Sequence, residues 1–179
     1  MLRSRFFLLL GILFCSACGF HLQGEMKLAP PLYHLYLQTA DPYGYLANNL
    51  RQYLKTSRVQ LVATTGEASA VLAILRDESS QELLSVSGTQ QTRQYNLRVT
   101  VEFEITDAIG RALIPPQILT ETRAITVQSN QILGSSNEAN LFYQQMRRTL
   151  AYAIMNRLAS KEITQQINTN FYSKTSTHS

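Results

Sequence analysis

Few residues of this 179-residue sequence are of the types that carry out chemistry. The chain has two cysteines, Cys15 and Cys18, and three histidines, His21, His34 and His178. The histidines lack the spacing of a metal site, and neither a Gly-rich phosphate loop nor a Gly-x-Ser-x-Gly nucleophile elbow is present. Because no set of nucleophile, base and orienting group can be assembled, the sequence predicts a protein that is not an enzyme and holds no metal.

Cys18 is the exception, since it ends a secretory pattern. Two arginines precede an apolar stretch over 6–14, and the small residues Ser16 and Ala17 lie directly before the cysteine. This stretch is much shorter than the roughly 20 residues that a membrane-spanning helix needs. The sequence therefore predicts a signal peptide over 1–17, with an uncleaved membrane anchor as the alternative.

The Cys18 thiol is the group to which a lipoprotein attaches diacylglycerol, and cleavage before it frees an amine for an N-acyl chain. Two or more chains anchor a protein stably, where one chain binds only marginally. Cys15, which is apolar in character, stands where a lipobox usually has leucine, and Gly19 after the cysteine resembles an outer-membrane address. We expect diacylglycerol and an N-acyl chain on Cys18 and no other cofactor.

The bulk composition is that of one domain with a neutral polar surface. Hydrophobic residues make up 45% of the chain and charged residues only 16%, below the usual quarter. Without Arg3 and Arg5, which would leave with the signal peptide, 14 basic and 12 acidic residues remain, a net charge of +2. The lack of a dense Lys/Arg run argues against nucleic acid as a partner, whereas a modest basic patch can still meet an anionic lipid.

Hydrophobic periodicity predicts the strands of the mature chain. Strict alternation over 94–105 predicts a long strand with one buried face. Its outward face would carry Arg98, Thr100, Glu102 and Glu104. Shorter strands are predicted at 32–37, 59–62, 70–75 (with a continuation over 82–86) and 118–127, the last after an irregular connection at Pro115-Pro116.

Two helices are predicted between and after these strands. Asp41 and Pro42 suit the start of the first, over 41–57, and a capping box at Ser135 starts the second, over 137–163. Apolar residues recur four apart in both. Two helices packed on one face of a mostly antiparallel, roughly four-stranded sheet would give an α+β fold.

The chain is expected to divide into four parts. After the signal peptide, a lipidated tether over 18–31 leads into a single α+β domain over 32–167. The residues 168–179 are mostly Asn, Thr, Ser, Lys and His, which predicts a flexible C-terminal tail.

Several of these segments resemble the LptE family of lipopolysaccharide (LPS)-assembly lipoproteins. The start Cys-Gly-Phe-His-Leu-Gln-Gly over 18–24 resembles the family's Cys-Gly-aromatic-His-Leu-Arg start and is the most specific piece. The segment 41–46 is similar to the family's Asp-Pro-x-Gly-x-Leu helix start. Residues 94–97 resemble its long central strand, and residues 136–138 stand where its last helix begins.

The resemblance implies the same fold and a lipid-anchored position on the periplasmic side of the outer membrane. It implies a partner, the large barrel LptD, in whose lumen the protein sits as a plug and whose assembly it assists. It also implies binding of LPS on its way to the cell surface. A surface rich in Gln, Asn, Ser and Thr is compatible with the polar interior of a barrel.

Arg93 and Arg76 are the candidate LPS-binding residues, because phosphates favour basic side chains. The resemblance implies that LPS is bound by basic residues near the hairpin before the central strand and near the start of the last helix. This chain has no base over 86–89 and has Ser135-Ser136 where a lysine is expected. Arg93, just beyond the hairpin, is the nearest candidate and Arg76 the second; alternatively, both are ordinary strand-end surface residues.

Two other classes of function remain open. A lipid or lipoprotein carrier anchored to the outer membrane would need a closed apolar cavity, which two helices on a small sheet should not leave. A periplasmic enzyme would need an activity that one Glu or His substitution abolishes.

Overall fold

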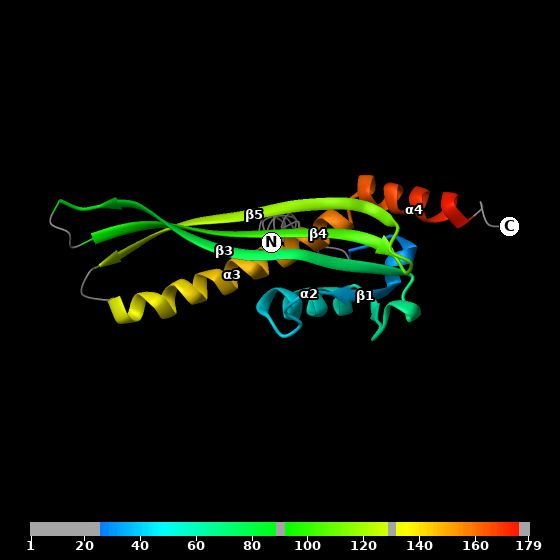
Figure 1. The fold of residues 1–179 in the computed structure, drawn as a ribbon, viewed down its shortest axis with the longest axis horizontal. Coiled ribbons are helices and arrows are strands. Elements are labelled where there is room, and N and C mark those ends of the chain that lie inside the picture. Colours follow the sequence, from blue (N-terminus) through cyan, green and yellow to red (C-terminus); the bar gives the residue numbers. More distant parts are fainter. Residues whose placement is uncertain (1–25, 89–91, 129–131, 176–179) are drawn as a thin grey trace, which may run out of the picture.

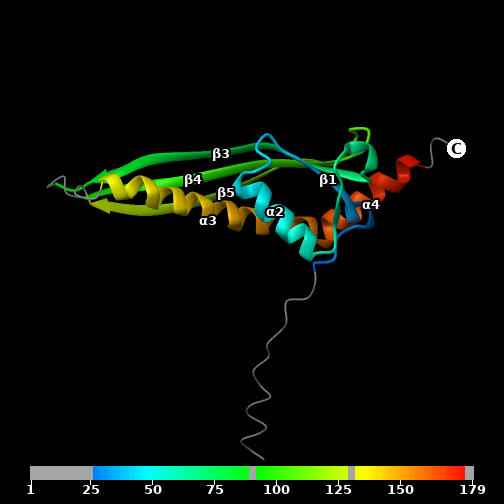
Figure 2. The same cartoon turned by 90° about the horizontal axis from the view of Figure 1, so that it is seen from below.

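The computed structural model describes residues 26–88, 92–128 and 132–175, with the side chains of 132–137 and 174–175 excepted. One elongated sheet carries the helices on a single face (Figure 1, Figure 2). The strands are β1 (His34–Gln38), β2 (Gln60–Leu61), β3 (Ala70–Val86), β4 (Thr92–Asp107) and β5 (Ala112–Gln128), and the α-helices are α2 (Tyr45–Thr56), α3 (Ile132–Leu158) and α4 (Lys161–Thr175). The predicted α+β class is confirmed.

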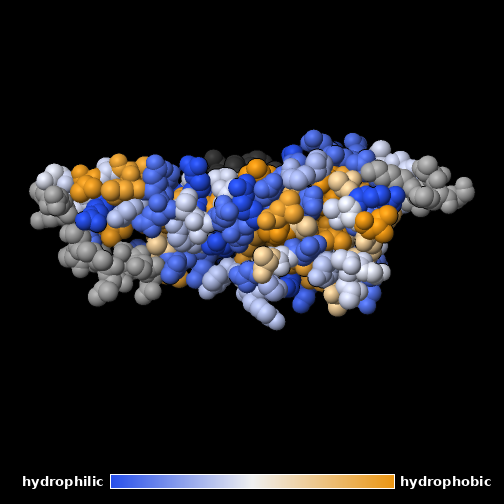
Figure 3. Space-filling view, viewed as in Figure 1, coloured by the Kyte–Doolittle hydropathy of each residue, from blue (hydrophilic) through white to orange (hydrophobic). Residues whose placement is uncertain are grey.

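Strands β3, β4 and β5 form a long antiparallel meander, as the alternating sequence predicts. On β4 the side chains from Leu97 to Ile105 that face the helices are fully buried at alternate positions. The predicted outward face is exposed or half-buried, and Thr100 and Thr120 share a hydroxyl hydrogen bond across it. Figure 3 shows this face as largely hydrophilic along the middle of the sheet. One face is therefore apolar and packed, and the other is wet.

The expectation of a mostly antiparallel, four-stranded sheet was incomplete. The sheet has five strands in the order β2-β1-β3-β4-β5, and β1 pairs in parallel with both β2 and β3. Helix α2 connects β1 to β2, and such a crossover returns the chain in the same direction. The two-residue strand β2 is too short for periodicity to reveal its direction.

Pro115 and Pro116 lie inside β5 rather than in an irregular connection, so that prediction was wrong. The register moves from Phe103 opposite Gln117 to Ile105 opposite Ile114, which places both prolines in a bulge. Strand β5 is at the edge of the sheet, where a missing backbone N–H breaks no ladder hydrogen bond.

Helix α2 begins at Tyr45, later than Asp41 and Pro42 predict, and Gly44 is its N-cap. Asp41 instead builds the preceding turn, because its Oδ1 accepts a hydrogen bond from Tyr43 N at 3.3 Å. A Cβ at Gly44 would collide with the Asp41 carboxylate. Asp41 and Gly44 therefore form one turn that fixes where the helix starts.

The predicted last helix is two helices. Helix α3 begins at Ile132, so Ser135 lies inside it and the expected capping box is wrong. The chain bends after Leu158, and the hydroxyl of Ser160 accepts a hydrogen bond from Ile163 N at 3.3 Å. Ser160 is thus the N-cap of α4, which the unbroken apolar stripe concealed. In the part of the chain that the structure describes, three α-helices therefore pack on the sheet, where the sequence predicted two.

Helix α4 replaces most of the flexible tail expected over 168–179. Ile167 is fully buried, and Asn170 Nδ2 donates to the Leu113 carbonyl at 2.9 Å. The helix runs to Thr175, and residues 176–179 lie outside the described part. Polar composition suggested disorder, but the partly buried Phe171 packs against the core and the Asn170–Leu113 hydrogen bond joins the segment to β5.

The C-terminal part of the expected tether is also packed. Leu28, Ala29 and Leu32 are buried in the main core, and Pro30–Tyr33 form a short 3₁₀ helix. The described segment that packs on the core therefore begins at Met26, well inside the expected tether over 18–31. None of the helices in the described ranges is long and apolar enough to cross a membrane.

The core occupies only one half of the molecule, which we call the proximal half. There α2, the second half of α3 and α4 cover the sheet, as Figure 2 shows. The other end of the meander, which we call the distal end, carries Val86 and Thr92 on its strands and is flanked only by the first turns of α3.

Candidate functional site

Arg93 lies on the helix-facing side of the sheet at the distal end. It is opposite Val86 of β3 and Val127 of β5 in the ladder, so these three side chains share one face. Arg93 is exposed, and Val86 keeps 44% of its surface exposed. The structure therefore places the first sequence-predicted residue between two apolar neighbours at the open end of the apolar face.

The next register step toward the core is apolar as well. Tyr95 stands opposite Leu83 and Ile125, and Leu83 is 52% exposed. Leu84, the extra residue of a β-bulge, is equally exposed beside it. Figure 3 shows hydrophobic residues gathered at this end of the molecule. A contiguous exposed apolar patch of this kind marks an interaction site.

A small cleft of about 190 Å³ opens between β5 and α3 next to this patch. Arg123 of β5 lies at it, with its guanidinium carbon 5.0 Å from the centre of the Phe142 ring and its Nη1 donating to Gln145 Oε1 at 2.8 Å. Val127 lines the same cleft and links it to Arg93 through the ladder. A cation held over an aromatic face is pre-positioned for an anion.

Arg123 is the functional candidate that sequence reasoning missed. It stands opposite the buried Leu97, so it shares the helix-facing side of the sheet with Arg93. The two arginines are four register steps apart, roughly 13 Å at the usual rise of a strand. The signal was the alternation of β5, which places Arg123 in line with Ile125 and Val127.

Arg93 and Arg123, with the apolar side chains between them, form what we call the distal site. A ligand that fits it has anionic groups for the guanidinium forks and apolar chains for the leucine and valine surface. Glu138 also lines the cleft and would repel an anion placed deep inside it. In the described ranges no cluster of three or more His, Cys, Asp and Glu side chains forms a metal site.

Arg76, the second sequence candidate, lies elsewhere. It stands opposite Glu102, ten residues of β3 from Val86 and roughly 33 Å away at the usual strand rise. Its guanidinium pairs with Glu102 Oε2 at 3.2 Å and Glu78 Oε2 at 3.9 Å. Because two carboxylates already neutralise it, Arg76 is a weaker anion ligand than Arg93, and the structure does not bring the two together.

A larger cleft of about 510 Å³ lies between the loop before α2 and the outer edge of β3. Arg76 lines it together with Asp77 and Arg147, whose Nε donates to the Asp77 carboxylate at 3.0 Å. Asp77 lies on β3 and joins that strand to α3. Asp77 and Arg147 are paired with each other at this cleft, whereas Arg76 pairs with Glu102 and Glu78, and the Asp41 carboxylate accepts a backbone hydrogen bond.

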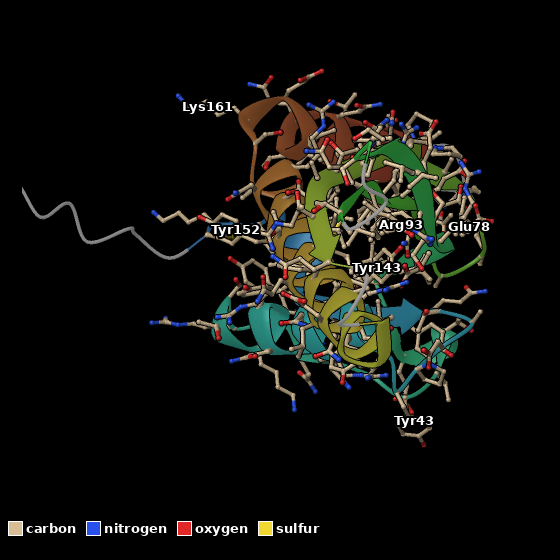
Figure 4. The ribbon with its side chains drawn as sticks, turned by 90° about the vertical axis from the view of Figure 1, so that its left-hand side faces the viewer. Tyr43, Glu78, Arg93, Tyr143, Tyr152 and Lys161 are labelled. Carbon is tan, nitrogen blue, oxygen red and sulfur yellow. The ribbon has the colours of Figure 1, made fainter. Side chains whose placement is uncertain are left out.

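Tyr143 and Arg147 connect α3 to the edge of β3. The Tyr143 hydroxyl donates to the Ser80 carbonyl at 3.0 Å, and Figure 4 shows Tyr143 between the helices and the sheet. Burial raises the pKa of Tyr143 above its ordinary value, although the positive charge of Arg147 opposes the rise. The phenol therefore stays protonated and can donate. These contacts position the first turns of α3 beside the distal site.

The β4–β5 turn is closed by Asp107, the buried acidic residue at the opposite end of the strands. Burial by itself would raise the pKa of this carboxyl, but hydrogen bonds from the Arg111 side chain and from the backbone amides of Arg111 and Ile109 outweigh it. The pKa of Asp107 is therefore below its ordinary value. Gly110, at a φ of 84°, supplies the left-handed residue that this turn needs.

Cys18, the expected lipidation site, lies outside the described residues, and the structure neither tests nor places it. The hairpin residues 89–91 between β3 and β4 also lie outside the described part.

Comparison with known proteins places the chain among LPS-assembly proteins. The family model described as "LptE: Lipopolysaccharide-assembly" matches residues 32–158. The LPS-assembly lipoprotein LptE of Pectobacterium atrosepticum is 26% identical over 93% of this chain and 91% of its own length. The lipoprotein of the same name from Yersinia enterocolitica is 28% identical over 88% of this chain and 77% of its own length.

Solved structures share the fold. The minor lipoprotein of Acinetobacter baumannii superposes with a TM-score of 0.58 at 25% identity, covering 72% of this chain and 91% of its own. The rare lipoprotein B of Shewanella oneidensis gives the same TM-score and identity over 74% of this chain and 98% of its own. A lipoprotein B of Nitrosomonas europaea, at 22% identity and a TM-score of 0.63, covers 79% of this chain and 90% of its own.

Proposed function

The chain belongs to the LptE family of lipopolysaccharide-assembly lipoproteins, and on that premise we propose that it serves LPS transport to the outer membrane as a lipid-anchored partner of the LptD barrel. It sits in the barrel lumen as a plug, assists the folding of the barrel and binds LPS on its way to the outer leaflet. It carries out no catalysis and uses no cofactor besides its own acyl chains.

The anchor is the thiol of Cys18. The signal peptide over 1–17 is removed, and Cys18 becomes the acylated first residue of the mature chain on the periplasmic side of the outer membrane. The tether is the stretch between Cys18 and Met26, because Met26 packs against the core and Leu28 and Ala29 are buried in it. The folded body then begins at Met26 and continues through α4.

The plug role is supported by the shape and surface of the body. The meander of β3, β4 and β5 is long and narrow (Figure 1), and its outer face is polar along the middle of the sheet, with exposed hydrophobic residues such as Ile118 toward the proximal half (Figure 3). A polar face with few unpaired charges can contact the hydrophilic interior of a barrel without burying charged groups that lack a partner. Arg76 and Arg147 illustrate this pattern, because each is paired with carboxylates.

LPS binding is supported chiefly by one observation, the position of Arg93 between Val86 and Val127 at the open end of the apolar face. LPS carries phosphates next to acyl chains, so its recognition needs cations beside apolar surface. The distal site offers Arg93 and Arg123 with exposed leucine and valine side chains. The distal end is also the part of the sheet that the core leaves uncovered.

The test is LPS affinity of the purified lipoprotein with Arg93→Glu or Arg123→Glu. Each substitution removes a cation and adds an anion facing the LPS phosphates, so we expect LPS affinity to fall by about tenfold or more. The matched control is Arg98→Glu, since Arg98 is an exposed arginine on the outer face of the same strand as Arg93. Unchanged affinity in both distal-site variants would remove the distal site as the LPS contact.

A further inference from the structure

Charge is divided between the two layers of the fold. The three α-helices carry seven basic and two acidic residues, whereas the five strands carry four basic and seven acidic residues. Helix α2 has no acidic residue, and α3 has none after Glu138. A protein of nearly neutral net charge therefore has a basic helical layer and an acidic sheet layer.

Several cations of the helical layer are available to a partner. Lys55 of α2, Arg148 of α3 and Lys161 of α4 are exposed, as is Lys27 just before the core segment. Within the described residues, no hydrogen bond or ion pair joins any of these four to another side chain. Arg147, by contrast, is bound to Asp77. Three of the four available cations are on the helices, whereas Arg147 is paired with a strand residue.

Of these cations, Arg148 and Lys161 belong to the side of the molecule that is turned away from the sheet. Arg148, Tyr152 and Asn156 are four residues apart on α3 and share its outer ridge. Figure 4 shows Lys161 and Tyr152 together on one side of the molecule and Glu78 on the other. Tyr152 stacks edge-on against Tyr53 of α2, with ring centroids 5.9 Å apart. Aromatic rings among cations are typical of surfaces that lie at a lipid headgroup layer.

The position of the chain's first described residues connects this surface to the membrane. In Figure 2 the described chain starts, in blue, on the same edge as α2 and α3 and away from β3 and β4. Eight residue steps separate Cys18 from Met26, which span at most roughly 28 Å when fully extended. An acylated Cys18 would therefore hold the helical layer, rather than the outer sheet face, next to the membrane.

We propose that the basic helical layer is a docking surface for anionic phospholipid headgroups, on which the lipoprotein lies with its outer sheet face exposed before it meets the barrel. This inference rests on the proposed acylation of Cys18, because the short tether supplies the proximity. Lys27, Lys55, Arg148 and Lys161 supply the attraction, which acts over about a Debye length. Docking leaves the distal site and the acidic sheet side free for LPS and barrel.

The test uses the full acylated lipoprotein in phosphatidylcholine vesicles with or without phosphatidylglycerol. The chain has no tryptophan, so single reporters can be introduced at Asn156 on the outer ridge of α3 and at Thr122 on β5, both exposed. A spin label on the lipid headgroups quenches tryptophan near the membrane surface. With phosphatidylglycerol present, we expect quenching of Asn156→Trp at least about twofold stronger than that of Thr122→Trp, and a smaller difference at high salt.

A charge-reversed chain with Lys55→Glu, Arg148→Glu and Lys161→Glu should lose the difference, while Arg98→Glu on the sheet should keep it. Equal quenching of both reporters in a chain that floats with vesicles at high salt would overturn the docking surface but leave the anchor intact. A chain that does not float at high salt would overturn the anchor and the docking together. Shielding of Asn156→Trp only after the barrel is added would make the helical layer a protein interface and contradict the membrane proposal.

Discussion

Arg147 of α3 donates a hydrogen bond to each carboxylate oxygen of Asp77 on β3, both at 3.0 Å, across 70 residues of sequence. This pair and the Tyr143–Ser80 hydrogen bond are polar links between α3 and the open edge of β3. They lie where the packed core ends and the distal end begins, so they set the angle at which α3 continues past the sheet.

Breaking this pair should loosen the distal end. In Arg147→Ala the half-buried Asp77 carboxylate loses its partner, and we expect the free energy of unfolding to fall by about 1–2 kcal/mol. Chemical denaturation of both single variants and of the double variant Asp77→Ala/Arg147→Ala gives the coupling energy. The exposed neighbour Arg148→Ala is the control. Additive effects of the two substitutions would show that the pair does not connect α3 to β3.

The β4–β5 turn should make stability depend on pH. The pKa of Asp107 is lowered in the folded protein, so the folded state binds fewer protons than the unfolded chain near the ordinary aspartate pKa of about 3.9. Its stabilising contribution is complete above that value and is lost as the pH falls through the lowered folded-state pKa.

The measurement is the free energy of unfolding between about pH 6 and pH 2, compared with Asp107→Asn. The variant should have a shallower pH slope and lower stability at neutral pH, because the charged hydrogen bond with Arg111 is gone. Identical slopes in the two proteins would mean that Asp107 has no lowered pKa in the folded state.

Helix α4 should contribute to the fold. Ile167 is fully buried in the core. Ile167→Ala should therefore lower the free energy of unfolding by about 2–4 kcal/mol, because apolar burial is lost and a cavity forms. Thr169→Ala, at an exposed position of the same helix, is the matched control. Equal melting temperatures of the two variants would show that the burial of Ile167 does not stabilise the fold.

The Asp41–Gly44 turn should tolerate change poorly. In Gly44→Ala the new Cβ meets the Asp41 carboxylate, so this exposed carboxylate must turn away and give up its hydrogen bond from Tyr43 N. We expect a loss of about 1 kcal/mol, similar to that of Asp41→Ala, and no further loss in Gly44→Ala/Asp41→Ala, because each single change removes the same hydrogen bond. Thermal melts of the single and double variants measure this. A single variant as stable as the wild type would show that Gly44 is not needed for steric reasons.

The sequence could predict those strands and helices in which one face is buried and the other exposed, because burial of one face determines the hydrophobic periodicity. The alternation from Tyr95 to Ile105 revealed β4 because its inner side chains are buried and its outer ones are not. The bulge at Pro115 and Pro116 was missed, since its reason is the position of β5 at the sheet edge, a property of the whole sheet.

In the helices and the distal site, too, features that depend on contacts between distant parts of the chain could not be predicted from the sequence. The break between α3 and α4 depends on the Ser160 cap within an otherwise continuous apolar stripe. Arg93 was found from its place beside the hairpin, but Arg123 gains its meaning only from Phe142, which α3 brings to it from elsewhere in the sequence. Arg76 was a reasonable candidate until its two carboxylate partners were placed.

The anchor can be tested on the mature protein by mass spectrometry of its amino-terminal peptide. We expect a chain that begins at Cys18 and carries the mass of a diacylglyceryl group and an N-acyl chain. Cys18→Ala should retain the signal peptide and carry no acyl groups. An unmodified thiol at Cys18 in the wild type would remove the basis for placing the protein on the membrane.

The proposed role in LPS transport is tested most directly by purifying the affinity-tagged lipoprotein from detergent-solubilised outer membrane and identifying what accompanies it. We expect one large barrel protein in equal amount, with LPS in the same complex and less LPS when Arg93 and Arg123 are both replaced by glutamate. A lipoprotein that is purified alone, with neither barrel nor LPS, would contradict the account.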